Sequence, residues 1–218
     1  MAIQTLPKAA KKVFETVYKL TNAFGEKPDN IAFEGDYASC LFSNKRGITE
    51  IFVANNTPTA LVPDISADWN FVVSMEQLKE LKKPNVITDI KHDGDTVEIS
   101  KIPTVDDPSS KIILKEHSWV RKDNPFDLLE KLEWAMLEIP DKFDILKYNF
   151  DTGNLVRPGE EDSAGAVLYI DSKIVPKSTV RRQCYLSIEQ YDENFIYPVL
   201  YTEHENYRIL IRYMKILR

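Results

Sequence analysis

Two groups of residues in this chain of 218 amino acids could carry chemistry. The first is Asp171 and Lys173, which follow the apolar run AVLYI, with Asp144 or Asp151 upstream as a further carboxylate. Carboxylates with a lysine two residues away can hold Mg²⁺ and a nucleophilic water, which is the chemistry of a metal-dependent nuclease. Solvated charges at the end of a strand would give the same short pattern, so both interpretations stay open.

The second group is basic, in a chain whose formal net charge is −6. Nothing in these segments is arranged to read base edges. Basic faces of this kind contact phosphate without regard to base sequence, which suits a protein that moves along DNA. The residues are Lys8, Lys11, Lys12 and Lys19, then Lys79, Lys82 and Lys83, and finally Lys173, Lys177, Arg181 and Arg182.

The composition is that of a globular protein with a core, since 43% of the residues are hydrophobic and 28% are charged. Cys40 and Cys184 stand far apart without a CxxC spacing, which indicates a reduced, cytoplasmic setting. His92, His117 and His204 are isolated, so a histidine-built metal site is not expected. The sequence has no Walker motif, GxGxxG or GxSxG, and no apolar run of signal-peptide or membrane-helix length.

The elements that must position the lysines can be predicted from the first half of the chain. Residues 7–22 have apolar residues at helical spacing, with lysines on the opposite face. Residues 74–84 predict a second helix, because Ser74 and Gln77 have the spacing of a capping box. Strands are predicted at 30–37, 38–44 and 47–55, and a hairpin at 85–102 turns at Asp93–Gly94.

The second half is predicted to repeat this order of elements. Residues 103–111 have the composition of a linker, and the run at 111–120 favours a strand. Asn124 and Pro125 predict the start of a third helix over 125–139. The segment around Cys184 fits a helix or a strand, and its β-rich context favours a strand from about residue 183. The buried stripe of the third helix would be Leu128, Leu129, Leu132, Met136 and Ile139, and further strands are predicted at 143–150, 164–171 and in the two terminal runs.

The repeated order predicts an α+β fold of two similar domains. The acidic-turn hairpin IKHDGDTVEI in the first half corresponds to IEQYDENFIY in the second, although the two halves share negligible identity. The expected limits are 1–105 for the first domain, 106–122 for a connector and 123–218 for the second domain.

This order resembles that of the DNA polymerase sliding clamps, specifically the two-domain clamps of T-even-type bacteriophages, within the PCNA-like family. In residues 164–218, the segments AGAVLYID, SKIVPKS, QCYLSIEQ, NFIYPVLYTEH and ENYRILI follow the family's final strand, short helix and three-strand meander. In the first half, AKKVFETVYKLTN, NIAFEGDY, DWNFVVSMEQLKELKK and IKHDGDTVEI follow it as well. The resemblance covers nearly the whole chain in pattern, apolar spacing and length, and includes no diagnostic motif.

The resemblance implies two clamp domains, each a curved antiparallel sheet backed by short helices, assembling as a homotrimer into a ring around duplex DNA. It implies a viral, non-catalytic processivity factor that tethers the replicative polymerase, is placed on DNA by a separate clamp loader and needs no cofactor, metal or membrane. The DNA-facing residues would be the basic residues named above, Lys173 excepted.

The apolar end of the chain has two interpretations. Tyr213, Met214, Ile216 and Leu217 either complete the core or, with connector residues, form a pocket for the C-terminal peptides of partner proteins. The pocket residues would be Ile113, Leu114, Val120, Tyr213, Ile216 and Leu217.

One segment departs from the family pattern, and two other functions stay open. The third predicted helix is acidic, with Asp127, Glu130, Glu133 and Glu138 against Lys131 alone. The first alternative function is a nuclease of the PD-(D/E)xK type around Asp171 and Lys173. The second is a monomeric viral protein that binds a host factor through the edges of its sheet.

Overall fold

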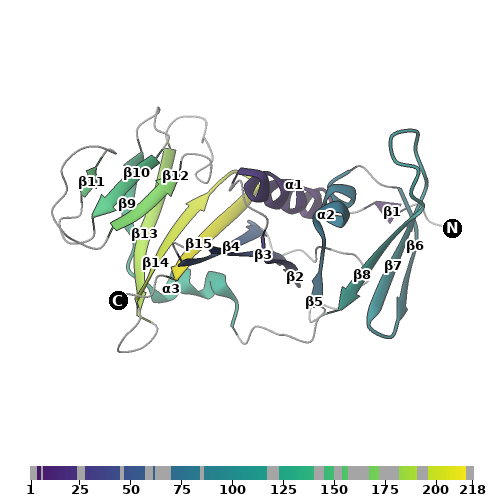
Figure 1. Ribbon diagram of the computed structural model, residues 1–218, viewed down its shortest axis with the longest axis horizontal. Coiled ribbons are helices and arrows are strands. Elements are labelled where there is room, and N and C mark those ends of the chain that lie inside the picture. The colour runs from purple at the N-terminus through teal and green to yellow at the C-terminus, as the bar shows by residue number, and fades with distance from the viewer. Residues whose placement is uncertain are drawn as a thin grey trace.

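A computed structural model gives the arrangement of the elements (Figure 1). The described residues are 4–5, 7–23, 28–44, 47–56, 61, 70–83, 86–116, 123–139, 145–149, 154–156, 167–171, 182–190 and 196–214. In the strands between residues 145 and 171 only the backbone is described, except at Asn149.

Two antiparallel sheets make up the strands of the described residues. The larger has 12 strands in the order β1-β6-β7-β8-β5-β2-β3-β4-β15-β14-β13-β9, and the smaller has 3 in the order β11-β10-β12. The strands of the first half are β1 (Gln4–Thr5), β2 (Asn30–Glu34), β3 (Tyr37–Asn44), β4 (Gly47–Asn55), β5 (Asn70–Val72), β6 (Val86–Asp93), β7 (Thr96–Lys101) and β8 (Lys111–Glu116). Those of the second half are β9 (Ala135–Ile139), β10 (Ile145–Asn149), β11 (Asn154–Val156), β12 (Val167–Asp171), β13 (Arg182–Gln190), β14 (Ile196–Glu203) and β15 (Tyr207–Met214).

The expected α+β fold of two similar domains is wrong, because the architecture is mainly β. A single 12-stranded sheet runs through both halves of the chain, and the described helices are few and short. The halves join where β15 pairs with β4, from Tyr207 opposite Asn55 to Met214 opposite Ile48. The limits 1–105, 106–122 and 123–218 are not tested by this sheet order and stay a prediction.

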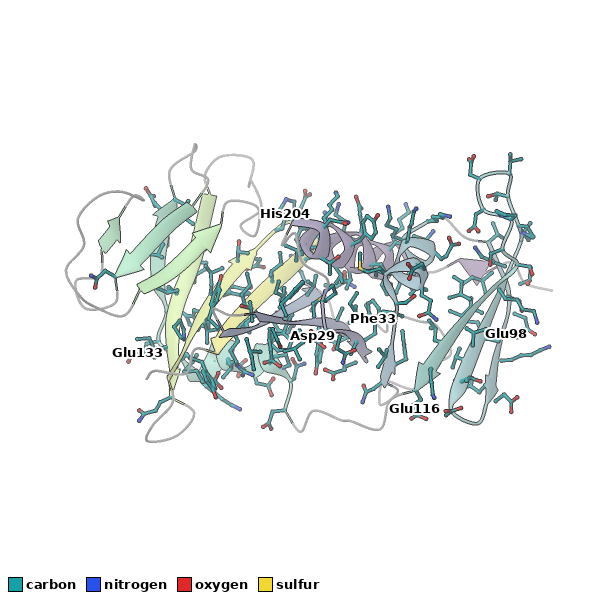
Figure 2. The ribbon with its side chains drawn as sticks, viewed as in Figure 1. Asp29, Phe33, Glu98, Glu116, Glu133 and His204 are labelled. Carbon is teal, nitrogen blue, oxygen red and sulfur yellow. The ribbon has the colours of Figure 1, made fainter. Side chains whose placement is uncertain are left out.

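Helix α1 (Lys8–Ala23) packs on β3 and β4 and contacts α2 (Met75–Leu81), so both helices lie on one face of the sheet (Figure 1). The helical spacing correctly predicted both α1 and its buried face. Phe14 of α1 meets Phe33 of β2 edge to face, with ring centroids 4.8 Å apart, and Figure 2 labels Phe33 beneath the helix. The buried stripe is Ala10, Val13, Phe14, Val17 and Leu20, none of them more than 5% exposed.

The capping box that was predicted for α2 is present. The Ser74 hydroxyl accepts a hydrogen bond from the Gln77 backbone N–H at 3.2 Å, and the Gln77 side-chain oxygen accepts one from the Ser74 N–H at 2.7 Å. These bonds satisfy two of the N–H groups that a helix start leaves unpaired. Leu78 and Leu81 are fully buried, so the other face of α2 carries its lysines outward.

The helix predicted over 125–139 is wrong. The chain forms a 3₁₀ turn (Pro125–Asp127) and one helical turn, α3 (Leu128–Lys131), and then extends at Leu132, where ψ is 151°. Residues 135–139 instead pair with β13 as strand β9. Met136 is accordingly 55% exposed, whereas Ile139 is buried. The apolar spacing of this segment fits both structures, and tertiary pairing decided between them.

The final strand has both faces buried. Ile209 and Ile211 lie in the core under α1, and Leu210 lies in a second core on the opposite face. On that opposite face Arg212 forms ion pairs with Glu50 of β4, at 3.2 Å, and with Glu189 of β13, at 2.7 Å. The terminal segment therefore does more than close a sheet of the second half, because it joins the two halves of the chain.

Candidate nucleic-acid interface

The lysines of α1 and α2 form a layer on one face of the molecule. Over residues 8–23 and 75–83 there are seven lysines and three glutamates. We call this set the lysine layer: Lys8, Lys11, Lys12, Lys19, Lys79, Lys82 and Lys83. Lys8, Lys19 and Lys79 are exposed and the other four are half-buried. A surface of this kind attracts phosphate by charge, and its affinity for DNA would fall as salt rises.

Part of the lysine layer is neutralised by Glu15. The Glu15 carboxylate lies 2.7 Å from Lys19 Nζ and 3.5 Å from Lys12 Nζ. The hydrogen bond from Lys19, aided by the charge of Lys12, lowers the pKa of Glu15, which therefore stays ionised at neutral pH. These two lysines are thus less available to a phosphate than their exposure suggests.

A cation–π contact connects the two helices. Lys82 Nζ lies 4.4 Å from the centroid of the Tyr18 ring, so the ammonium of α2 sits over an aromatic side chain of α1. This contact helps to fix α2 relative to α1.

A partly buried group of charges holds the end of α2, and we call it the Lys101 cluster: Lys101 and Asp107, which are buried, and Glu80 and Lys83, which are half-buried. The Lys101 side chain is 1% exposed, with Nζ 2.7 Å from Glu80 Oε2 and in contact with Asp107 Oδ2. Lys83 Nζ lies 2.9 Å from Glu80 Oε1 and 3.6 Å from Asp107 Oδ2. A hydrogen bond with Glu80 and one from Lys101 hold the pKa of Asp107 well below its ordinary value. The cluster ties α2 to β7 and to the turn at 104–107.

Three lysines of the layer have neither an acidic nor an aromatic partner among the described residues. Lys8, Lys11 and Lys79 form no ion pair with any acidic side chain in the part of the chain that the structure describes. They are therefore the residues of the layer best placed to contact phosphate.

On the opposite face of the sheet, the side chains exposed near α3 are mainly acidic. Asp127, Glu130 and Glu133 are exposed there, with Lys131 as the basic residue between them. Phe126 packs in the core on this side, with Phe52 and Leu210. Figure 1 shows α3 across the sheet from α1 and α2. The acidic segment that departed from the family pattern therefore lies away from the lysine layer.

Comparison with known proteins gives matches among solved structures. No family model and no curated protein matches this chain. Among solved structures, a chain described as "C-terminal region of FEN-1 bound to A. fulgidus PCNA" is similar, with a TM-score of 0.46 and 11% sequence identity. The alignment covers 100% of this chain and 99% of that chain.

Several predicted site residues lie outside the described residues. Lys177 and Arg181 of the third basic segment do so, and Arg182 begins β13 opposite Ile139 with its side chain not described. Of the predicted pocket, Val120, Ile216 and Leu217 also lie outside.

The described pocket residues are not brought together. Ile113 is 54% exposed and its neighbour Leu114 is fully buried, so they point to opposite faces of β8. Tyr213 lies on β15, which is separated from β8 by β5, β2, β3 and β4 in the sheet. A partner pocket built from β8 and β15 together is therefore not formed by these residues.

The residues of the nuclease hypothesis are only partly described. Asp171 ends β12 opposite Ile145, whereas Lys173, Asp144 and Asp151 lie outside the described residues. Within the described ranges, no three His, Cys, Asp or Glu side chains are grouped to hold a metal ion. Burial raises the pKa of both thiols, Cys40 and Cys184, to about 12, so neither ionises near neutral pH. No described helix is long and apolar enough to cross a membrane.

Proposed function

We propose that the chain is a DNA polymerase sliding clamp of the T-even bacteriophage type, a processivity factor that encircles duplex DNA in the host cytoplasm. The lysine layer on α1 and α2 carries this proposal, because it concentrates positive charge on one face of a chain whose net charge is −6. The net charge of a chain does not show where its charges lie, and a local basic face is sufficient to bind a polyanion.

The layer suits contact without sequence reading. Lys8, Lys11 and Lys79 act on phosphate as mobile point charges. None of the three is an Arg, Asn or Gln side chain that forms two hydrogen bonds with one base edge. Such contacts position a protein on DNA and leave it able to slide. The proposed protein is accordingly not an enzyme and uses no cofactor.

Closure around DNA requires a contact between copies. The outer side of β9 and that of β6 beyond Val86 and Ile87 pair with no other described strand. Open edges pair readily, and a head-to-tail contact closes when the rotation per subunit allows it. We assign these two edges to the contact between subunits of a homotrimer. A clamp loader would place the trimer on DNA, and the replicative polymerase would bind it there.

Duplex binding tests this function in the purified protein. Fluorescence anisotropy with two labelled duplexes of unrelated sequence is expected to give equal affinities. The logarithm of the binding constant is expected to fall with the logarithm of salt with a slope of about −2.7 or steeper, from about 0.9 for each of three lysines. Absence of binding at low salt, or a strong preference for one duplex, would contradict the proposal.

A further inference from the structure

A histidine stacked on a tyrosine adjoins the lysine layer. His204 lies in the turn between β14 and β15, and its ring stacks on that of Tyr207, with centroids 4.7 Å apart and planes 9° apart. Lys12 Nζ of α1 lies 6.0 Å from the centroid of the same Tyr207 ring, and Figure 2 labels His204 near this helix. Because both groups contact one ring, a DNA backbone bound along α1 passes within reach of the imidazole.

The backbone of this turn is held independently of the histidine side chain. The Asn56 side-chain Nδ2 donates to the backbone carbonyl of His204 at 2.7 Å and to that of Glu205 at 3.0 Å. The backbone N–H of His204 donates to the Tyr207 carbonyl at 2.8 Å. A substitution at His204 leaves these three bonds in place, so the imidazole can be altered without releasing the turn.

Two polar groups that border Tyr207 are buried and have no hydrogen-bond partner among the described residues. One is Nδ1 of His204. The other is the side-chain amide of Asn55, which is 3% exposed and lies opposite Tyr207 in the pairing of β4 with β15. Directly opposite residues of an antiparallel pair have adjacent side chains. The amide oxygen is thus an acceptor available to an N–H at Nδ1, which the doubly protonated ring has.

The charges at this end of the lysine layer are balanced near neutral pH. The Glu15 carboxylate lies between Lys12 and Lys19, at 3.5 and 2.7 Å from their Nζ atoms. Glu205 is exposed in the turn beside His204. Two ammonium groups therefore stand against two carboxylates, and a proton on the imidazole gives this end an excess of positive charge.

The groups that face the imidazole hold their charge while a histidine titrates. Glu15, whose pKa is lowered, stays ionised, and burial with the charge of Glu15 raises the pKa of Tyr207, so the phenol stays neutral. The two asparagines that β4 places here are neutral. Glu203 lies on the other face of the sheet, where its carboxylate accepts a hydrogen bond from the Tyr201 hydroxyl at 3.2 Å. Histidine is the side chain whose charge ordinarily changes between about pH 5 and pH 8.

We propose that His204 is a further phosphate contact of the DNA interface, made only when its imidazole is protonated, so that duplex binding strengthens as the pH falls from about 8 to about 6. The inference rests on the proposed function, because the anion is a phosphate of the bound duplex. Since Nδ1 is buried, Nε2 is the nitrogen that reaches the phosphate. The Tyr207 ring beneath the imidazole stabilises it as a cation.

Fluorescence anisotropy with one labelled duplex at about pH 6 and about pH 8 tests the proposal. The wild type is expected to bind at least threefold more tightly at the lower pH, with a salt slope steeper by about 0.9. His204→Gln is expected to match the wild type at the higher pH and to lose most of the gain. His204→Arg carries its charge at both pH values, so it is expected to bind more tightly than the wild type at about pH 8 and to change little with pH. His92→Gln, at an exposed position of β6, is the matched control and is expected to keep the gain.

The possible failures can be told apart. Binding at about pH 8 without a gain at about pH 6, or a gain that His204→Gln retains, overturns the role of His204 and leaves the proposed function standing. An equal loss of the gain in His92→Gln overturns it as well. Absence of binding at both pH values contradicts the proposed function and this inference together. In the wild type, an NMR titration of the His204 imidazole is also expected to show a higher midpoint with duplex than without it, because the coupling of proton and DNA binding is reciprocal; an unchanged midpoint overturns the proposal.

Discussion

Replacing Lys8, Lys11 and Lys79 with Glu is expected to abolish duplex binding at about 0.1 M salt while leaving the fold intact. These residues lie on the outward sides of α1 and α2 and form no ion pair with a described acidic side chain. Each lost phosphate contact reduces the salt slope by about 0.9, so the triple variant is expected to lose about 2.7 of it. Anisotropy titrations across a salt series measure this change, and circular dichroism reports the fold.

The matched control uses three lysines on the other face of the first half. Lys91, Lys111 and Lys115 are exposed on β6 and β8, and each lies near an acidic side chain: Asp89 at 3.4 Å, Glu98 at 2.8 Å and Asp95 at 3.9 Å. Figure 2 labels Glu98 on this part of the sheet. Changing them to Glu alters net charge by the same amount and is expected to preserve most of the binding. An equal loss in both triple variants would show that net charge, and not the lysine layer, governs binding.

The second large effect, a decrease in the free energy of unfolding, is expected from Lys101→Ala. Removing the ammonium leaves Glu80 and Asp107 close together with only Lys83 to compensate them, and Lys101 itself is 1% exposed. Breaking a buried ion pair by deleting one partner costs about 3–5 kcal/mol. We expect a decrease in unfolding free energy of about 3 kcal/mol, at the lower limit because Lys83 stays. Urea denaturation at pH 7 measures it, and an unchanged midpoint would contradict the role of the cluster.

Acid titration supplies a separate control for that cluster. The folded-state pKa of Asp107 lies below its ordinary value of 3.8. The stabilisation from this lowered pKa is therefore complete above about pH 4 and is lost as the pH falls toward the folded pKa. Asp107→Asn is expected to remove this part of the acid sensitivity, so its unfolding free energy should change less between pH 5 and pH 2. If its pH dependence matched that of the wild type, Asp107 would not be the group responsible.

Local patterns predicted the first half of the fold well. The spacing of Ala10, Val13, Phe14 and Val17 places α1 and its buried face, and the Ser74–Gln77 capping box places the start of α2. The hairpin at Asp93–Gly94 is also confirmed, with Gly94 at φ +58°, a left-handed conformation that glycine adopts without strain. In each case the physical cause acts between neighbours in sequence, so the sequence pattern contains it.

The failures come from long-range pairing. The segment 125–139 has the apolar spacing of a helix, yet its second part is held as strand β9 by pairing with β13. The predicted α+β fold class was wrong for the same kind of reason, because no local sequence pattern indicates that β15 pairs with β4. Alternation within β15 separates Ile209 and Ile211 from Leu210, which lies on the other face, but it does not indicate which strand lies beside β15.

The sequence predicted which lysines form the candidate interface, but it did not predict the contacts that these lysines make. Helical spacing places the lysines of α1 and α2 on outward faces, which the structure confirms for Lys8, Lys19 and Lys79. The pairing of Lys83 with Asp107 joins α2 to a turn beyond the hairpin and could not be read from spacing. Lys101 did carry a signal, since alternation from Val97 and Ile99 places it on the buried face of β7. A lysine at such a position requires a buried carboxylate partner.

Electron micrographs of the purified protein at high concentration test the central claim most directly. If the chain is a sliding clamp, class averages will show closed particles with three-fold symmetry and a central opening, of a size set by three chains of 25.1 kDa each. Monomers at every concentration, or dimers with two-fold symmetry and no opening, would contradict it.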